Sequence, residues 1–535
     1  MSTRESKPRS DRDRTDLLER LREATELLEQ VAADRGLLAD LASEERRRLL
    51  QAAGSVFHPD PAERRRLIKT IERLRRGDKA QRDDELLAGT GIRALRRQTV
   101  FTTPRAFAPT TFEPHDVQPA ESDEQTARAA AAPEPSVRER ACYICKNRYT
   151  TVHHFYDRLC PECGDLSYFK RTELADLSGR FALLTGGRVK IGYQAGLKLL
   201  RAGAHLIVTT RFPRDSAKRY AQEPDFEQWA HRLEIFGLDL RHTPSVEAFC
   251  RVLADTHPRL DYIVNNACQT VRRPPDFYAH MMEDEAASLR SMPAQQRKLL
   301  GAYEGLRGYH LLPEAGAEAL TPEALDQKAV ELAGLTHAAQ LSQVPLLPEE
   351  FRAQRDLFPV GRLDQDLQQI DLRGRNSWRL LLAEVPTVEL LEVQLVNAIA
   401  PFVLNARLKP LMLRTPERDK HIVNVSAMEG QFYKSFKTTR HPHTNMAKAA
   451  LNMMTRTAAT DYEQDGIHMN SIDTGWVTDE DPAEIAARKV ADHRFYPPLD
   501  IVDGAARIVD PIITGVNTGR HVWGQFLKDF RPTDW

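Results

Sequence analysis

The sequence predicts an α/β fold built on a doubly wound parallel sheet, preceded by a helical amino-terminal region and a small zinc-binding module. Three observations support this prediction. Beyond Leu174, short apolar segments alternate with helical segments, which is the pattern of a parallel sheet covered on both faces. The glycine-rich residues 185–192 lie between an apolar segment and a helix, where backbone N–H groups can bind a phosphate. Two Cys-x-x-Cys pairs precede this region.

Length and composition limit the class of protein. The chain has 535 residues and a net charge of -1, which predicts more than one domain and favours neither nucleic acid nor an anionic membrane as a partner. No apolar run approaches the roughly 20 residues needed to span a bilayer. The first residues lack the apolar core of a signal peptide, and six cysteines are too few for a disulfide scaffold. We therefore expect a cytoplasmic protein without a membrane-spanning segment.

Residues 1–103 are predicted to form charged helices. One apolar stripe repeats at spacings of four and three residues: Leu17, Leu21, Ala24, Leu28 and Val31. The other faces carry many arginines with acidic residues between them, which favours a docking or dimerisation module for protein over a nucleic-acid contact. Residues 104–139, rich in Pro, Ala, Thr, Glu and Ser, predict a disordered linker.

Four cysteines in residues 140–170 indicate a metal site. Cys142 and Cys145 form one pair, Cys160 and Cys163 form a second pair, and fourteen residues lie between the pairs. Two such pairs can place four thiolates around one tetrahedral ion, which fills its coordination shell and predicts structural zinc. The spacing resembles that of zinc ribbons, which often contact protein or nucleic acid. His153 and His154 lie between the pairs and are interpreted as surface residues, although either could replace a ligand.

The main domain is predicted to occupy residues 174–535. Its expected strands are 181–184, 206–210, 234–238, 262–265, 422–426, 468–472 and 521–526. An insertion at about 269–378, with a helical segment at 320–332, follows the fourth strand on the rim where open parallel sheets bind ligands. A lid, a specificity cap and an oligomer contact all remain open as roles for this insertion.

Motifs at the strand ends resemble those of the short-chain dehydrogenase/reductases. In chain order they are Thr185-Gly186 with Ile191-Gly192, Asp239-Leu240, Asn265-Asn266-Ala267-Cys268, Val396-Asn397, the segment 422–426, the helix that begins at Lys448, and the segment 470–478. Lys190 stands where the family has its middle glycine, and Cys268 replaces another glycine. The resemblance implies a Rossmann-type domain, an oxidoreductase acting on a small molecule, and a homo-oligomer.

The resemblance also implies which residues hold a dinucleotide. They are Gly186, Arg188, Lys190, Ile191, Gly192, Arg211, Asp239, Leu240, Asn266, Ala267, Lys448, Gly475, Val477 and Thr478. The second strand ends without an acidic residue, and the three cations Arg188, Lys190 and Arg211 favour NADP(H), with NAD(H) still possible. Alternatively, Arg188 and Lys190 bind the pyrophosphate or point to solvent.

Family resemblance gives Asn397 the role of holding a water molecule in a proton relay, and gives Lys448 the role of lowering the pKa of a catalytic tyrosine. That tyrosine would stand four residues before Lys448, where this chain has Thr444, a far weaker acid. The family's serine aligns with Ala427, and Ser426 lies one residue earlier. The catalytic candidates are therefore Asn397, Ser426, Lys448, Thr444 and the nearby Tyr433.

His441 and His443 are further substitutes for the missing proton donor, because a histidine can carry a proton near neutral pH. Two functions follow. The first is an NADP(H)-dependent oxidoreductase with an atypical proton donor and an unknown carbonyl or alcohol substrate. The second is a catalytically degenerate dinucleotide-binding scaffold or sensor, whose zinc module and helical arm recruit a protein, or less readily a nucleic acid.

Overall fold

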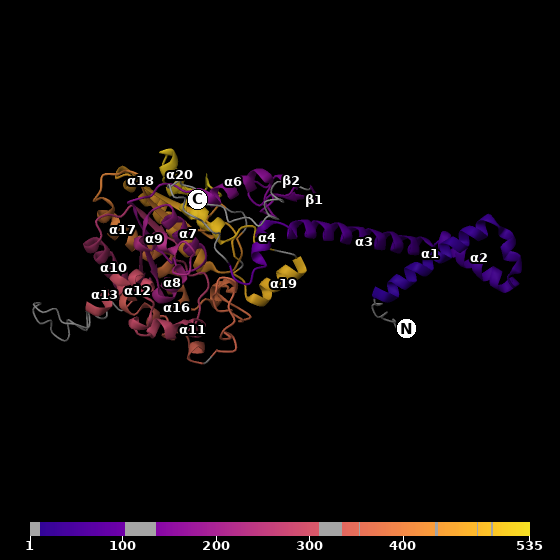
Figure 1. Cartoon of the computed structure of the whole chain (residues 1–535), viewed down its shortest axis with the longest axis horizontal. Helices are drawn as coiled ribbons and strands as arrows, with labels where there is room; N and C mark the ends of the chain where they lie inside the picture. Colours follow the sequence, from indigo (N-terminus) through magenta and orange to yellow (C-terminus); the bar gives the residue numbers. More distant parts are fainter. Residues whose placement is uncertain are drawn as a thin grey trace, which may run out of the picture. The chain divides into compact units, whose positions relative to one another are not determined.

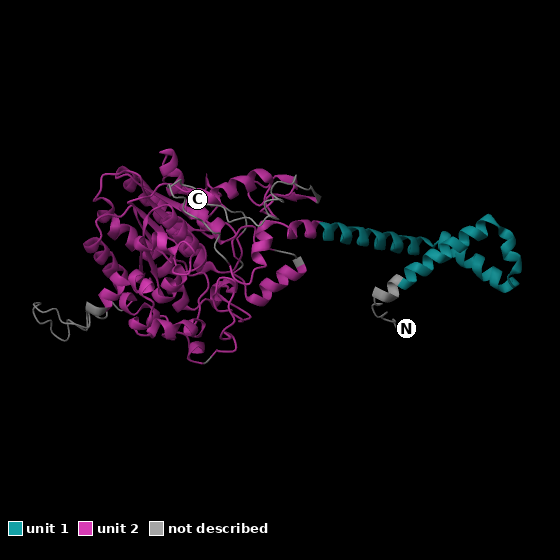
Figure 2. Ribbon diagram, viewed as in Figure 1, with its two compact units in different colours: residues 1–82 teal, residues 83–535 magenta. Residues whose placement is uncertain are grey.

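The computed structural model describes residues 11–101, 135–309, 334–352, 354–433, 437–478, 480–493 and 496–535. It divides into two compact units, Met1–Arg82 (unit 1) and Asp83–Trp535 (unit 2), which are coloured separately in Figure 2. Most of the expected linker, residues 104–134, and the expected helical segment 320–332 lie outside the described residues.

Unit 1 consists of helices. They are α1 (Asp11–Ala33), the 3-10 turn η1 (Arg35–Asp40), α2 (Ser43–Phe57) and most of α3 (Pro61–Ala88). Asp60 caps α3, because its Oδ1 accepts hydrogen bonds from the N–H groups of Ala62 at 2.5 Å and Glu63 at 3.1 Å. The apolar stripe of α1 is exposed, with Leu21 at 56% and Leu28 at 42% exposure.

Unit 2 is organised around a central sheet surrounded by helices (Figure 1). The sheet has eight strands in the order β10-β9-β8-β7-β6-β3-β4-β5, and only the β9–β10 pair is antiparallel. The strands are β3 (Phe181–Thr185), β4 (His205–Thr210), β5 (Leu233–Gly237), β6 (Tyr262–Asn265), β7 (Lys420–Ser426), β8 (Ile467–Asp473), β9 (Phe526–Lys528) and β10 (Arg531–Thr533). This order confirms the predicted doubly wound sheet, and its direction reverses between β3 and β6.

Helices cover both faces of this sheet. Helix α7 (Lys190–Arg201) packs against α20 (Ile501–Thr518) on one face, and α10 (Thr243–Thr256) packs against α17 (Ala400–Met412) on the other. Helix α18 (Pro442–Gln464) lies over β7 and β8. Each residue of β6, β7 and β8 is buried, including polar residues such as Asn424 and Asn470, as expected for central strands of a sheet covered on both faces.

The remaining helices of unit 2 lie in the connections. They are α4 (Gly91–Arg96), α6 (Pro161–Thr172), α8 (Pro213–Tyr220), α9 (Phe226–Trp229), α11 (Pro275–Ala286), α12 (Ala294–Leu299), α13 (Gly301–Tyr309), α15 (Ala338–Leu341), α16 (Thr387–Gln394) and α19 (Ala483–His493). A π-helical turn, η7 (Leu395–Ile399), joins α16 to α17. Such turns often occur at functional sites.

The first six predicted strands agree with the structure within two residues, but the seventh is wrong. Residues 521–525 form no strand, and β9 begins at Phe526. The segment runs beside β8 through separate hydrogen bonds. The N–H of Gly524 donates to the carbonyl of Met469 at 2.8 Å, the N–H of Ser471 donates to the carbonyl of Gln525 at 3.0 Å, and Asn470 donates to the carbonyl of Val522 at 2.6 Å. These bonds hold the segment without a continuous β ladder.

A small hairpin precedes the sheet domain within unit 2. Strands β1 (Pro135–Ala141) and β2 (Arg148–Thr151) pair antiparallel, and α6 follows them. Strand β1 begins inside the segment that was expected to be linker. His153, interpreted above as a surface residue, is buried: its Nδ1 accepts from the N–H of Phe155 at 3.0 Å and Tyr156 at 3.2 Å. Its role is to shape the turn beneath the cysteines.

Among the described residues, one helical segment, Thr387–Met412, is long and apolar enough to cross a membrane by length and composition. Half of its most apolar stretch of 18 residues is buried inside the protein, and α17 packs between α10 and the sheet. The core helix of a folded domain passes the same test, so this segment is weak evidence for a membrane span.

Candidate functional site

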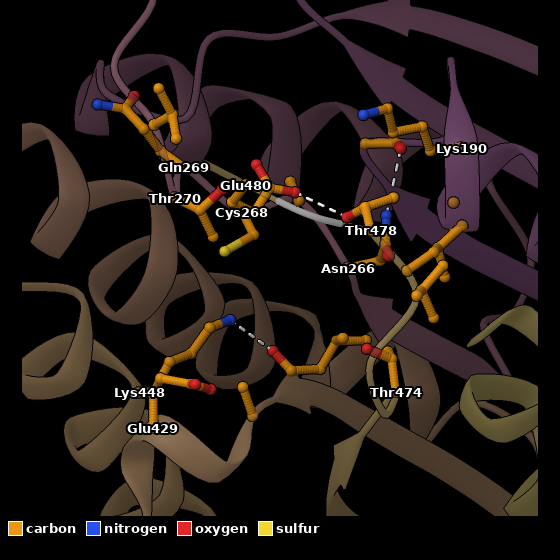
Figure 3. A pocket seen from close by; sticks show the side chains of 18 of the residues that line it. Lys190, Asn266, Cys268, Gln269, Thr270, Glu429, Lys448, Thr474, Thr478 and Glu480 are labelled. Carbon is orange, nitrogen blue, oxygen red and sulfur yellow. Dashed lines mark hydrogen bonds between the residues drawn. The ribbon is translucent and has the colours of Figure 1, made fainter. Parts of the chain in front are cut away.

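A cavity of about 1160 Å³ opens at the carboxyl ends of the parallel strands (Figure 3). Residues that follow β3, β4, β5, β6, β7 and β8 all contribute to its wall. It includes the point between β3 and β6 where the strand order reverses, which is where open α/β sheets bind ligands. All fourteen residues expected to hold a dinucleotide line this one cavity.

The glycine loop between β3 and α7 is tightly packed against the end of β6. Gly186 has φ +70°, and a Cβ on it would lie 2.8 Å from the Cα of Ala267. A Cβ on Gly192 would lie 2.2 Å from the carbonyl oxygen of Gly186. Asn266 fixes the loop by donating to the carbonyls of Thr185 at 3.1 Å and Gly186 at 3.2 Å. The loop therefore requires glycine at both of its ends.

Lys190 occupies the position of the missing middle glycine. Its φ of +53° lies in the left-handed region that glycine adopts most readily. The residue begins α7, so its backbone lies at the positive end of the helix dipole. In Figure 3, Lys190 and Asn266 lie on one side of the pocket and Lys448 on another. The backbone of this loop thus keeps the conformation of a glycine loop and adds a cation.

Two other expected cations are held by neighbouring side chains. Arg188 is buried and donates to Asp215 at 2.6 Å. Arg211 donates to the hydroxyl of Tyr278 at 2.7 Å and stacks over that ring at 4.7 Å. Both guanidinium groups therefore have fixed orientations on the cavity wall, and Arg188 is partly neutralised.

An ion network that sequence reasoning missed crosses the cavity wall. Burial alone would raise the pKa of Asp239, but the Arg241 guanidinium holds that pKa below its ordinary value. Arg241 donates to Asp239 at 2.6 Å and to Glu392 of α16 at 2.8 Å. Glu392 also pairs with Arg272 at 2.9 Å, and Arg272 pairs with Glu350 of the insertion. Because residues 241 and 392 are far apart in sequence, no local motif reveals this network.

Lys448 and Ser426 lie together on the cavity wall near the end of β7. Lys448 is buried, and its Nζ donates to the carbonyl of Val425 at 2.7 Å. The Oγ of Ser426 is buried and has no hydrogen-bond partner among the described residues. Ala427 also lines the cavity, because the strand ends there and successive residues no longer alternate between its faces.

The candidates for the missing proton donor separate into two groups. His441 and Tyr433 line the cavity, whereas Thr444 and His443 are buried outside its wall. His441 stacks on Trp378 at 3.9 Å, and burial lowers its pKa to about 4. Tyr433 is 52% exposed. Residues 434–436, part of the second Tyr-x-x-x-Lys string, lie outside the described residues.

Asn397, in the π-helical turn η7, is buried and does not line the cavity. Its Oδ1 accepts from the N–H of Gln269 at 2.8 Å, and its Nδ2 donates to the carbonyl of the same residue at 3.0 Å. The oxygen and the nitrogen of the carboxamide thus both bond to the backbone of Gln269. In this structure Asn397 clamps the chain where the insertion leaves β6.

The insertion contributes directly to the cavity. Arg272, Arg273, Tyr278, Gln368 and Trp378 all line it. This placement favours a cap over the cavity among the three roles left open by the sequence.

The four cysteines of the predicted zinc module come together. Their Sγ atoms all lie within 4.8 Å of one another, and those of Cys145 and Cys160 are 3.7 Å apart. A Cβ on Gly164 would lie 2.5 Å from the His153 ring, so the helix that carries Cys163 packs closely on that turn. No histidine belongs to this cluster in the part of the chain that the structure describes.

Comparison with known proteins identifies the domain. A family model described as short chain dehydrogenase matches residues 180–288, and one described as Enoyl-(Acyl carrier protein) reductase matches residues 376–495. A protein of Acanthamoeba polyphaga mimivirus, described as uncharacterized, is 30% identical over 400 residues, which is 73% of this chain and 74% of the relative. The chain is a short-chain dehydrogenase/reductase. The resemblance inferred from the sequence motifs is thereby confirmed.

Other relatives of this short-chain dehydrogenase/reductase match over shorter lengths. Dehydrogenase/reductase SDR family member 13 of Bos taurus is 33% identical over 105 residues, 19% of this chain and 28% of the relative. Retinol dehydrogenase 14 of Mus musculus is 33% identical over 102 residues, 17% of this chain and 30% of the relative. These matches cover less than a third of either relative.

Solved structures align with about two thirds of the chain. The Pseudomonas aeruginosa RhlG/NADP active-site complex aligns with a TM-score of 0.39 at 16% identity, covering 66% of this short-chain dehydrogenase/reductase and 95% of that chain. A dehydrogenase/reductase of Sinorhizobium meliloti aligns with a TM-score of 0.39 at 17% identity, covering 66% and 94%.

Proposed function

We propose that this protein is an NADP(H)-dependent oxidoreductase that interconverts a carbonyl and an alcohol on a small molecule. The observation that carries the proposal is the cavity at the strand-order reversal, which all fourteen expected dinucleotide residues, Lys448 among them, line together with Ser426. A bound nicotinamide dinucleotide would supply or accept the hydride. The protein must then bind the dinucleotide, orient the substrate oxygen and supply a proton.

Binding of the dinucleotide is assigned to three groups of residues. The 185–192 loop and the first turn of α7 bind the pyrophosphate through backbone N–H groups. Arg211 lies at the end of β4, where an acidic residue would exclude a 2′-phosphate, so its guanidinium favours NADP(H). Lys448 uses one N–H on the carbonyl of Val425 and retains two donors for the hydroxyls of a ribose.

Orientation of the substrate oxygen is assigned to Ser426, whose buried hydroxyl has no partner among the described residues. Leaving such a donor unpaired costs about 1–3 kcal/mol, which a bound oxygen would relieve. The proton is assigned to the groups on the cavity wall, Ser426, His441 and Tyr433, rather than to Thr444. With a pKa of about 4, His441 is neutral at pH 7 and can donate only through its ring N–H.

A second function, a dinucleotide-binding scaffold or sensor without turnover, is supported by two observations. Thr444 stands at the expected tyrosine position but lies outside the cavity wall. The carboxamide of Asn397 is bonded to Gln269 through both its Oδ1 and its Nδ2, and Asn397 does not line the cavity. In this alternative the exposed stripe of unit 1 and the cysteine module recruit a protein partner.

We also propose that Cys142, Cys145, Cys160 and Cys163 bind one structural Zn²⁺. Four Zn–S bonds of ~2.3 Å in a tetrahedron would separate the sulfurs by roughly 3.8 Å. The observed separation of 3.7 Å between Cys145 and Cys160 agrees with this geometry. No step of the reaction is assigned to this ion.

Calorimetric titration of the purified chain with NADPH and NADH tests dinucleotide binding. We expect NADPH to bind more tightly than NADH. Arg211→Ala should weaken NADPH binding at least tenfold and change the affinity for NADH little. Tyr278→Phe, which removes the hydroxyl that orients Arg211 but keeps the ring, should weaken NADPH binding by less than Arg211→Ala. Absence of binding by both nucleotides would exclude both proposed functions.

Turnover is tested with a panel of aldehydes and ketones by following NADPH absorbance. Ser426→Ala and Lys448→Ala should each lower kcat by at least a hundredfold if the protein is an enzyme. Thr444→Val should retain activity, since that hydroxyl does not reach the cavity. Tight NADPH binding with no turnover on any substrate of the panel would support the sensor.

A further inference from the structure

The cysteine hairpin, residues 142–147, reaches the dinucleotide cavity. Tyr143, Ile144 and Lys146 of this hairpin line the cavity wall. The hairpin closes on itself, because the N–H of Cys142 donates to the carbonyl of Asn147 at 2.9 Å and the N–H of Lys146 donates to Cys142 at 3.1 Å. Residues between two metal-binding cysteines therefore form part of the proposed cofactor site, a placement that sequence spacing did not predict.

Tyr143 makes the direct contact. Its hydroxyl accepts a hydrogen bond from the N–H of Trp476 at 3.0 Å. Trp476 belongs to the 473–478 loop, which begins at the last residue of β8 and contains Gly475, Val477 and Thr478, three of the expected dinucleotide residues. A Cβ on Gly475 would lie 3.6 Å from the Tyr143 hydroxyl. The hydroxyl thus fixes the backbone of a loop that forms one side of the cavity.

The cysteine module and this loop also share one hydrophobic core. Its buried members from the module are Cys142, Tyr149, Tyr156, Leu159 and Cys160, and from the sheet domain Val477, Leu499, Ile501 and Val502. Ile191, from the first turn of α7, packs against the same core. Movement of the module would therefore disturb two segments of the cavity wall at once.

Charged contacts fix the module on the sheet domain. Arg171 of α6 is buried and donates to both carboxylate oxygens of Asp500, at 2.7 and 2.8 Å. Asp500 in turn caps α20 by accepting from the N–H groups of Val502 and Asp503. The hydroxyl of Tyr156 donates to Asp503. These contacts explain how a small module can hold a loop of the larger domain in place.

We propose that the cysteine module is a wall of the dinucleotide site, that Tyr143 is the residue that positions the 473–478 loop, and that metal and dinucleotide binding are therefore coupled. The proposal rests on the dinucleotide binding proposed above. An ion held by Cys142 and Cys145 fixes the backbone between them, and with it the Tyr143 ring. Without the ion, that backbone gains conformational freedom, which dinucleotide binding must remove.

The first test separates the Tyr143 hydroxyl from the fold of the module. Tyr143→Phe should weaken NADPH binding about fivefold, the effect of one lost hydrogen bond, with zinc content unchanged and Tm lowered by no more than about 2–4 °C. Tyr149→Phe makes the same chemical change on β2 of the same module, away from the cavity wall, and should leave NADPH affinity unchanged. Equal weakening by both variants, or by neither, would overturn the assignment of Tyr143.

The second test measures the coupling in both directions. Removing zinc from the full-length protein with a chelator should weaken NADPH binding at least tenfold, while the circular dichroism spectrum of the protein stays nearly unchanged because the sheet domain remains folded. Linkage then requires saturating NADPH to tighten zinc binding by the same factor in an equilibrium competition with a chromogenic chelator. Wild-type protein that binds NADPH equally with and without zinc would refute the coupling and leave the proposed function standing. Wild-type protein that binds no dinucleotide would refute both.

Discussion

At the scale of single residues, Lys190 combines a cation at the glycine loop with a backbone conformation that favours glycine. A left-handed conformation costs a non-glycine residue about 1 kcal/mol, so its presence here calls for a compensating role. The position at the start of α7, where the helix dipole is positive, fits a contact with a phosphate.

Substitution of Lys190 can separate these two properties. Lys190→Gly should raise the free energy of unfolding by up to about 1 kcal/mol and weaken NADPH roughly fivefold to tenfold. Lys190→Gln, which removes the charge and keeps the strain, should weaken NADPH similarly without stabilising the fold. Denaturant unfolding and calorimetric titration measure the two effects. NADPH affinity of the wild-type level in both variants would show that Lys190 does not contact the phosphates.

At the scale of elements, the insertion helix α11 is joined to α8 by a buried carboxyl group. Glu285 accepts hydrogen bonds from the N–H groups of Arg214 and Asp215, each at 3.0 Å, at the start of α8. Burial raises the pKa of Glu285 to about 7, although these N–H groups and the Arg214 side chain favour the ionised form. The folded state is therefore less stable when the carboxyl group of Glu285 is ionised than when it is protonated.

The raised pKa of Glu285 predicts a pH dependence of stability. The folded state holds the proton more tightly than the unfolded chain, whose ordinary value is 4.5, so stability is lost as the pH rises from about 4.5 through about 7. The total loss is roughly 3 kcal/mol at most. Glu285→Gln keeps the acceptor oxygen and should flatten this part of the profile, whereas Asp284→Asn, at an exposed neighbour, should not. Identical profiles for Glu285→Gln and the wild type would contradict the assignment.

The sequence predicted those structural elements that depend on residues adjacent to one another in the chain. The buried strands, the glycine loop around Gly186 and the two cysteine pairs each follow from neighbouring residues, and the structure has each of them. The pairing of Arg241 with Glu392 and the use of Asn397 as a clamp depend on residues distant in sequence. The same cause explains why the contact between Tyr143 and Trp476 could not be predicted: 333 residues separate them.

At the scale of the whole molecule, the helices beside the cavity present an apolar surface to solvent. Leu391 and Phe402, on the α16–α17 segment, are 57% and 60% exposed, and Met446 and Met453, on α18, are 54% and 59% exposed. These helices pack against each other, so the four exposed side chains lie on neighbouring helices, and we refer to them together as the α16–α18 patch. Apolar patches of this kind mark interaction surfaces, and a twofold axis through one would bury it against a second copy.

This patch predicts that the protein is a homodimer through α17 and α18. Phe402→Glu with Met453→Glu should convert the dimer to a monomer in light scattering coupled to size exclusion, because two charges on each copy would be desolvated in the interface. Phe351→Glu, at an insertion residue that is 73% exposed, is the matched control and should leave the dimer intact. A dimer that survives the double substitution but dissociates in Leu21→Asp would place self-association on the stripe of α1 instead. A wild-type monomer at micromolar concentration would exclude both surfaces as sites of stable self-association.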